Sequence, residues 1–213
     1  MFPNQKLDIV ETIKEGINIG FTNLAPILVN VVLWVLTCWI PYLNVGTTIG
    51  LFVGIVSKAS RGETISSTEI FDPKYRKYMG EFFLTFGMMI VGIYAGFIFG
   101  IIPGIIISYA WSLALLLLID KGKNPTEALT LSNNFTYGYK WRMFAIYLLL
   151  GITFAILATL FALIPYLCYV LIFALIVVLL GVQIGVQASI YRQLTEEEHV
   201  PVIEVSPETT VTT

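Results

Sequence analysis

Apolar positions along the chain form three long stretches that polar segments separate. They run from Gly16 to Ser57, from Phe82 to Ile119 and from Met143 to Tyr191, and none contains Asp, Glu, Lys, Arg or His. Their lengths are 42, 38 and 49 residues. One helix needs about 20 apolar residues to cross the roughly 30 Å of hydrocarbon in a bilayer. Each stretch therefore predicts two membrane-spanning helices, and the chain six.

A proline interrupts each stretch, at Pro41, Pro103 and Pro165, with 62 residues between successive prolines. Helices tend to end or kink at proline, and a fixed period is typical of a repeated unit. We therefore expect an all-α polytopic bundle of six transmembrane helices arranged as three hairpins. Two expected spans are short for a bilayer, so re-entrant hairpins are the alternative to full crossings. The spans lie at about 18–40, 42–58, 82–102, 105–119, 143–164 and 167–191, within a single membrane domain of residues 1–194.

Polar segments beside the spans predict short amphipathic helices on the cytoplasmic side. Ser66 to Glu69 has the form of a capping box, and Asn124, followed by Pro125 and Glu127, has the form of a helix N-cap. The segment before the first span predicts a helix in the headgroup plane, with the packed start of the bundle as the alternative. Its apolar positions recur every three to four residues, at Leu7, Val10, Ile13, Ile17 and Phe21.

Composition and charge support a membrane location and give an orientation. The chain is 57% hydrophobic and 12% charged, with a mean hydropathy of +0.83, whereas soluble domains are usually about a quarter charged. All 12 Lys and Arg residues flank the stretches on the side away from the prolines. Cytoplasmic loops retain Lys and Arg. We therefore predict a multi-pass protein of the inner (plasma) membrane with both termini in the cytoplasm.

The remaining special residues predict little chemistry. Residues 195–213 contain five Glu and no Lys or Arg, which predicts a disordered tail, and the single histidine, His199, lies in it. Cys38 and Cys168 are expected at similar depth near the outer surface. The two cysteines either form a disulfide or remain unbonded and pack as small apolar side chains, and we favour the second alternative.

Glycines recur every four residues in three of the expected spans. This spacing places them on one helix face, and faces of small residues let helices approach closely in lipid. We favour packing within the chain, with oligomerisation and a glycine-lined conduit as alternatives. The candidate packing residues are Gly46, Gly50 and Gly54, then Gly92, Gly96, Gly100 and Gly104, and finally Gly181 and Gly185.

Two further sets of polar residues are candidates for binding. Gln183 and Gln187 share a face of the last span and are candidates for a polar cavity, although hydrogen bonding between helices is the commoner role. Basic side chains at the inner ends of the third and fifth spans are candidates for contacts with phospholipid headgroups. These are Lys74, Arg76, Lys77, Lys140 and Arg142. We predict no catalytic, cofactor-binding or metal-ligating residue.

A family resemblance rests on four features of one region. They are a proline–glycine turn in Ile101–Ile105, an apolar span to Asp120, a charged turn at 121–124, and an amphipathic segment from Pro125 through Ala128-Leu129 to Ser132. In these features the chain resembles the membrane domain associated with glycerophosphodiester phosphodiesterases and related prokaryotic six-helix families of unknown function. The likeness covers most of residues 15–192. It implies a membrane module and carries over no catalytic residue, since no phosphodiesterase domain is recognisable.

These features predict a protein that is not an enzyme. We expect a scaffold or accessory that organises membrane lipids or partner proteins, as a homo-oligomer or beside another membrane protein. The alternative is a channel or facilitator for a small neutral or lipid-like solute. The lack of ionisable side chains within the spans counts against an ion-coupled pump, and nothing in the sequence indicates nucleic-acid binding.

Overall fold

The computed structural model describes residues 7–163 and 168–195, and this part of the chain is built from helices without any strand. Five helical segments are long and apolar enough to cross a membrane, and a bent pair near the N-terminus gives a sixth if it counts as one span. The expectation of an all-helical chain with several apolar helices of membrane length is confirmed. The five segments are Pro41–Ser60, Met79–Phe99, Ile101–Asp120, Lys140–Ala162 and Tyr169–Thr195.

The first two helices form the bent pair. Helix α1 (Ile9–Thr22) and helix α2 (Leu24–Thr37) meet at Asn23 with a bend of 69°. The expected span 18–40 is therefore not one straight helix. The Asn23 side-chain amide donates a hydrogen bond back to the carbonyl of Ile19, 2.9 Å away, which closes the end of α1. Pro26 then lies in the first turn of α2, where its missing N–H is tolerated.

The next span is a continuous helical rod that contains a π-helical turn. It consists of α3 (Pro41–Ile49), η1 (Gly50–Gly54) and α4 (Ile55–Ser60). A short 3-10 helix, η2 (Glu69–Phe71), and the single turn α5 (Lys74–Lys77) follow it. Both lie in the segment that the sequence places in the first cytoplasmic loop.

The middle of the chain is a hairpin with one broken arm. Helix α6 (Met79–Phe99) turns at Gly100, whose φ of 150° favours glycine, into α7 (Ile101–Ala110). A break over residues 111–113 separates α7 from α8 (Ala114–Asp120). The remaining helices are α9 (Pro125–Thr136), α10 (Lys140–Ala162) and α11 (Cys168–Thr195).

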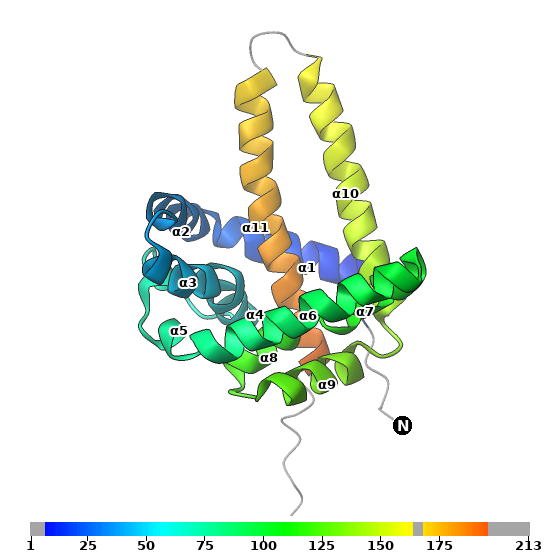
Figure 1. Ribbon diagram of the computed structural model, residues 1–213. Coiled ribbons are helices and arrows are strands. Elements are labelled where there is room, and N and C mark those ends of the chain that lie inside the picture. The colour runs from blue at the N-terminus through cyan, green and yellow to red at the C-terminus, as the bar shows by residue number, and fades with distance from the viewer. Residues whose placement is uncertain (1–6, 164–167, 196–213) are drawn as a thin grey trace, which may run out of the picture.

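Most of α10 and the first part of α11 stand apart from the rest of the molecule. Figure 1 shows α10 and the first part of α11 rising clear of the other helices, while α6 runs across them. Along α10 only Met143 and Ile146 are buried. Large apolar side chains such as Leu149, Ile156 and Phe173 are exposed. These surfaces need an apolar solvent, as lipid provides.

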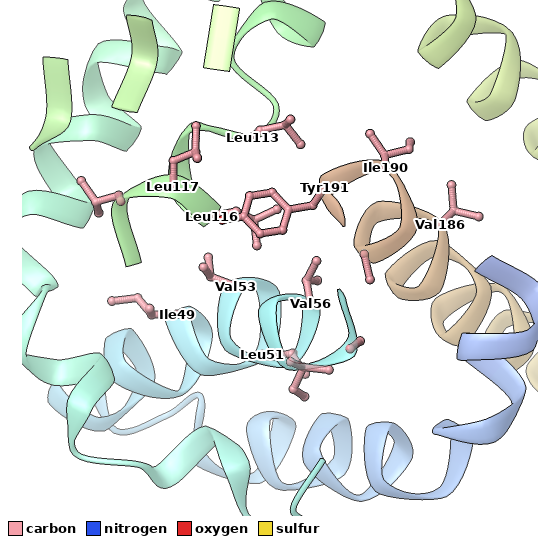
Figure 2. Close-up of a cluster of buried hydrophobic side chains, with 14 of the residues drawn as sticks. Ile49, Leu51, Val53, Val56, Leu113, Leu116, Leu117, Val186, Ile190 and Tyr191 are labelled. Carbon is pink, nitrogen blue, oxygen red and sulfur yellow. The ribbon is translucent and has the colours of Figure 1, made fainter. Parts of the chain in front are cut away.

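The core forms where the α3–η1–α4 rod, α8 and the C-terminal half of α11 meet. Figure 2 shows Tyr191 of α11 lying between Leu116 of α8 and Val53 and Val56 of the rod. All four side chains are buried. In the second hairpin the second arm is the more buried one: 39% of an apolar window of Ile101–Asp120 is buried, against 17% for α6. The rod Pro41–Ser60 is 67% buried.

Helix α1 packs against the C-terminal half of α11 through small residues on both helices. A Cβ atom added at Gly20 would lie 2.6 Å from the carbonyl oxygen of Gly181, and one added at Gly185 would overlap the carbonyl oxygen of Gly16. Side chains at these positions would force the two backbones apart. Val10, Ile17 and Phe21 of α1 are exposed on the outside of this contact.

We predict that Gly185→Ala destabilises the protein by about 1–3 kcal/mol, because the added methyl group meets backbone that cannot move aside. Gly151→Ala is the matched control, since a Cβ atom there meets nothing within 4 Å. The control should be neutral or slightly stabilising, because alanine favours helix more than glycine does. Thermal unfolding in detergent, followed by circular dichroism, measures both. Equal midpoints for the two variants would contradict the close packing of α1 on α11.

Candidate functional site

Three of the apolar segments end at one carboxylate, Asp120, at the end of α8. The Tyr191 hydroxyl of α11 donates a hydrogen bond to Asp120 Oδ2 at 2.9 Å, and the Ser57 hydroxyl of α4 donates one to Oδ1. The Asp120 side chain is mostly buried, with a fractional solvent exposure of only 14%. Ser57 and Tyr191 are the last residues of the first and third uncharged stretches, and Asp120 directly follows Ile119, the last residue of the second. The cluster therefore marks where all three stretches end.

Arg61 completes the cluster from the first loop. Its guanidinium pairs with Asp120 and donates a hydrogen bond to Ser57 Oγ at 2.7 Å. It also pairs with Glu63 at 2.5 Å. This hydrogen bond raises the pKa of Arg61 and lowers the pKa of Glu63. Within the described residues Ser57 has no imidazole beside it, and its hydroxyl joins the arginine to the carboxylate.

A second carboxylate, Glu69 of η2, is buried beside this cluster. It accepts hydrogen bonds from Lys58 Nζ at 2.8 Å, from the Tyr75 hydroxyl at 2.7 Å and from Lys74 Nζ at 3.3 Å. Burial alone would raise the pKa of Glu69, but the bonds from Lys58 and Tyr75 and the lysine charges outweigh it, so this pKa is lowered. Burial and the bond to Glu69 raise the pKa of Tyr75.

The capping box predicted at Ser66 to Glu69 is wrong, whereas the N-cap at Asn124 is confirmed. Ser66 Oγ accepts a hydrogen bond from the Thr68 N–H and not from that of Glu69, and the Glu69 carboxylate bonds the lysines. Thr68 precedes η2 without a side-chain cap. Asn124 Oδ1 accepts a hydrogen bond from the backbone N–H of Glu127 at 2.9 Å.

Both loops fold back onto the spans and satisfy polar groups there. Asn30 of α2 is fully buried and donates a hydrogen bond to the Ser66 carbonyl at 2.8 Å. In the second loop the Ser132 hydroxyl donates to the Ala110 carbonyl at 2.7 Å and accepts from the Leu113 N–H at 3.2 Å. Ser132 thus bridges the break between α7 and α8, as polar backbone at membrane depth requires.

The predicted glycine faces lie against other parts of the same chain. Gly46 lies under the Arg76 side chain, Gly50 against Ile70 and Tyr75, and Gly54 against Tyr75, so the first loop covers the rod. In the second hairpin, Gly92 lies against Trp111, Gly96 against Gly104 and Ile107, Gly104 against Phe97, and Gly100 at the turn against Pro103. Gly181 and Gly185 lie against α1, as described above.

Gln183 and Gln187 line one pocket, but only Gln187 has hydrogen-bond partners. The pocket has a volume of about 420 Å³ and lies between α2, η1, α4 and α11, with Trp34 and Phe52 on its opposite wall. Gln187 accepts from the Tyr147 hydroxyl and donates to the Ser112 carbonyl at 3.3 Å. Gln183 is exposed and bonds to none of the described residues.

The predicted headgroup residues divide into paired and unpaired cations. Lys74 pairs with Glu69 and Asp72. Arg142 donates to the Leu7 carbonyl at 3.1 Å. Lys140 donates to the Asn133 side-chain carbonyl at 2.8 Å, and this partner is neutral. Among the described side chains, neither Arg76 nor Lys77 makes an ion pair.

Every cation that lines the pocket beside the Asp120 cluster is paired with a carboxylate. The pocket has a volume of about 320 Å³, and its cations are Lys58, Arg61 and Lys74. These three cations pair with four carboxylates, Glu63, Glu69, Asp72 and Asp120. An anion entering this pocket would have to displace a carboxylate.

Sequence reasoning missed the cluster at Asp120 and the small residues of α1. Gly16 and Gly20 have the same four-residue spacing as the predicted faces, so this spacing could have identified them. Asp120 carries no local signal, because its partners Ser57, Arg61 and Tyr191 lie 59 to 71 residues away in the sequence. In the described ranges no group of His, Cys, Asp and Glu residues is placed to hold a metal ion. The predicted tail begins at Thr195, which the structure places at the end of α11. Residues 196–213, His199 among them, and the Cys168 side chain lie outside what the structure describes.

Comparison with known proteins identifies no relative: no family model, curated protein or solved structure matches the chain. The resemblance to the phosphodiesterase-associated membrane domain therefore stays a prediction.

We predict that the Glu69 network makes stability depend on pH. The pKa of a glutamate in the unfolded chain is about 4.3, and the pKa of Glu69 in the folded protein is lower. The unfolded state therefore binds the proton first, and the stabilisation, complete above about pH 5, is lost as the pH falls through the folded pKa. Glu69→Gln should lower the thermal midpoint at pH 7, with a smaller difference from the wild type at pH 4. Glu81→Gln, at an exposed position, is the control. A difference that stays constant with pH would contradict this account.

Proposed function

We propose that the protein is a non-enzymatic integral membrane scaffold or accessory that organises membrane lipids or partner proteins. The observation that carries this proposal is the division of its surface. Its small-residue faces and interior polar groups contact other parts of the chain, while large apolar side chains remain exposed on α6, α10 and α11. Such surfaces bind lipid chains or the apolar helices of another membrane protein.

We also propose the arrangement in which this surface meets the bilayer. The chain forms three hairpins with both termini in the cytoplasm of a prokaryotic cell, and α1 and α9 are amphipathic helices at the inner face. The clustering of Arg61, Asp120 and Glu69 where spans end supports placing these ends on one side of the membrane. At the opposite ends, Trp39 and Tyr169 are more than 80% exposed, as aromatic side chains at a membrane–water interface are.

We predict opposite chemical accessibility for the two faces. In a background with Cys38→Ala and Cys168→Ala, Trp39→Cys should react with a membrane-impermeant maleimide in intact cells. Lys77→Cys should react only in inverted vesicles. Reaction of both cysteines from the same side would contradict this topology. Ile101→Cys decides the short hairpin: labelling from outside means a full crossing, whereas protection from both sides means a re-entrant hairpin.

A facilitator for a small neutral or lipid-like solute is the second candidate function. The observation in its favour is the pocket of about 420 Å³ beside Gln183 and Gln187. Against it, Gln187 is held between Tyr147 and Ser112, and the glycine faces contact helices and loops of the same chain.

Vesicles that contain the purified protein separate the two functions. We predict that the protein immobilises spin-labelled phospholipid, because exposed helices such as α10 order neighbouring acyl chains. It should leave the glycerol permeability of the vesicles unchanged. Glycerol flux that Gln183→Leu abolishes would support the facilitator instead. Thr153→Val is the control, since Thr153 is exposed and bonds only the Leu149 carbonyl of its own helix.

A further inference from the structure

We infer that a pocket between α7, α9 and the start of α10 binds the headgroup of an anionic glycerophospholipid from the inner leaflet. The pocket has a volume of about 380 Å³, within the usual range for small-molecule sites. Ile106, Ile107 and Trp111 form its apolar side. Thr130, Asn133 and Lys140 line its polar side. The inference deepens the proposed function by naming a lipid class, and in that respect rests on it.

Lys140 differs from the other cations that line a pocket, because none of the described carboxylates pairs with it. Its Nζ donates to Asn133 Oδ1 at 2.8 Å and lies 5.9 Å from the centre of the Tyr137 ring. An ammonium group carries three donors, so two remain. The Asn133 Nδ2 donors also have no partner in the described structure. An anion here would gain charge-assisted hydrogen bonds without displacing a carboxylate.

The position of the pocket favours a lipid over a free anion. Lys140 begins α10, so it lies where an apolar span meets the polar inner layer. The exposed aromatic residues Tyr137 and Trp141 flank it at the level expected for an interfacial belt. Ile106 is partly exposed and belongs to α7, which would let one acyl chain run along that helix while the phosphate contacts Lys140. A free phosphate would leave this apolar wall uncovered.

Trp111 provides a direct probe of the site. It lines the pocket and packs over Gly92, which fixes its place. In a variant whose single tryptophan is Trp111, with Trp34, Trp39 and Trp141 each changed to Phe, phosphatidylglycerol with brominated acyl chains should quench the fluorescence. It should do so at about one fifth of the concentration that brominated phosphatidylcholine needs, since one lysine near a membrane surface contributes about a fivefold preference.

Two substitutions test the role of Lys140. Lys140→Gln should abolish the preference. Asn133→Asp should also abolish it while keeping the lysine, because a carboxylate 2.8 Å from Nζ would occupy the ammonium. Lys140→Arg should retain the preference. Lys77→Gln is the matched control, because it removes an unpaired cation from the same face and should leave the preference intact.

The outcomes distinguish failure of this lipid site from failure of the proposed function. They also distinguish a lipid site from a site for a free anion. Equal quenching by the two lipids, or a preference unaffected by Lys140→Gln and Asn133→Asp, would overturn the inference. So would full displacement of the lipid by millimolar inorganic phosphate, which would make the pocket a site for the free anion. Near-ultraviolet circular dichroism checks that each variant is folded. Glycerol flux tests the proposed function separately, because neither substitution touches the pocket at Gln183.

Discussion

Polar groups inside this apolar molecule have to find partners within the protein, and the rest of the structure depends on that constraint. An unpaired polar group in hydrocarbon costs several kcal/mol. No buried side-chain nitrogen or oxygen in the described residues lacks a hydrogen-bond partner. Asn30 bonds the first loop, Ser132 bridges the break between α7 and α8, and Asp120 joins three span ends. The loops are therefore structural parts of the membrane domain.

The same constraint explains which helices form the core. Three elements carry the polar cluster at their ends and pack around Tyr191, whose hydroxyl belongs to the cluster. They are the α3–η1–α4 rod, α8 and the C-terminal half of α11. Helices α6 and α10 have few interior polar groups to satisfy, and their apolar side chains remain on the outside. A molecule of this kind has a closed polar centre and an extended apolar exterior.

Charge pairing distinguishes the cations of the first loop from Lys140. Lys58, Arg61 and Lys74 are bound to carboxylates, so they stabilise the junction between the first loop and the spans. Lys140 has only a neutral partner and lines an amphipathic pocket. The five basic residues singled out from the sequence therefore differ in their partners, although their local sequence contexts are similar. Only the positions of the carboxylates reveal the difference.

The sequence by itself determined the helical class, the number of apolar segments to within one, and the N-cap at Asn124, because span length and capping depend on neighbouring residues. It could not show the 69° bend at Asn23, since that bend accompanies the contact of Gly16 and Gly20 with a helix more than 160 residues away. Nor could it show that the glycines of the rod face a loop, or that the buried Glu69 leaves its predicted cap for Lys58 and Lys74. Tertiary structure decided these features, because contacts between distant residues select among conformations that local sequence leaves nearly equal in energy.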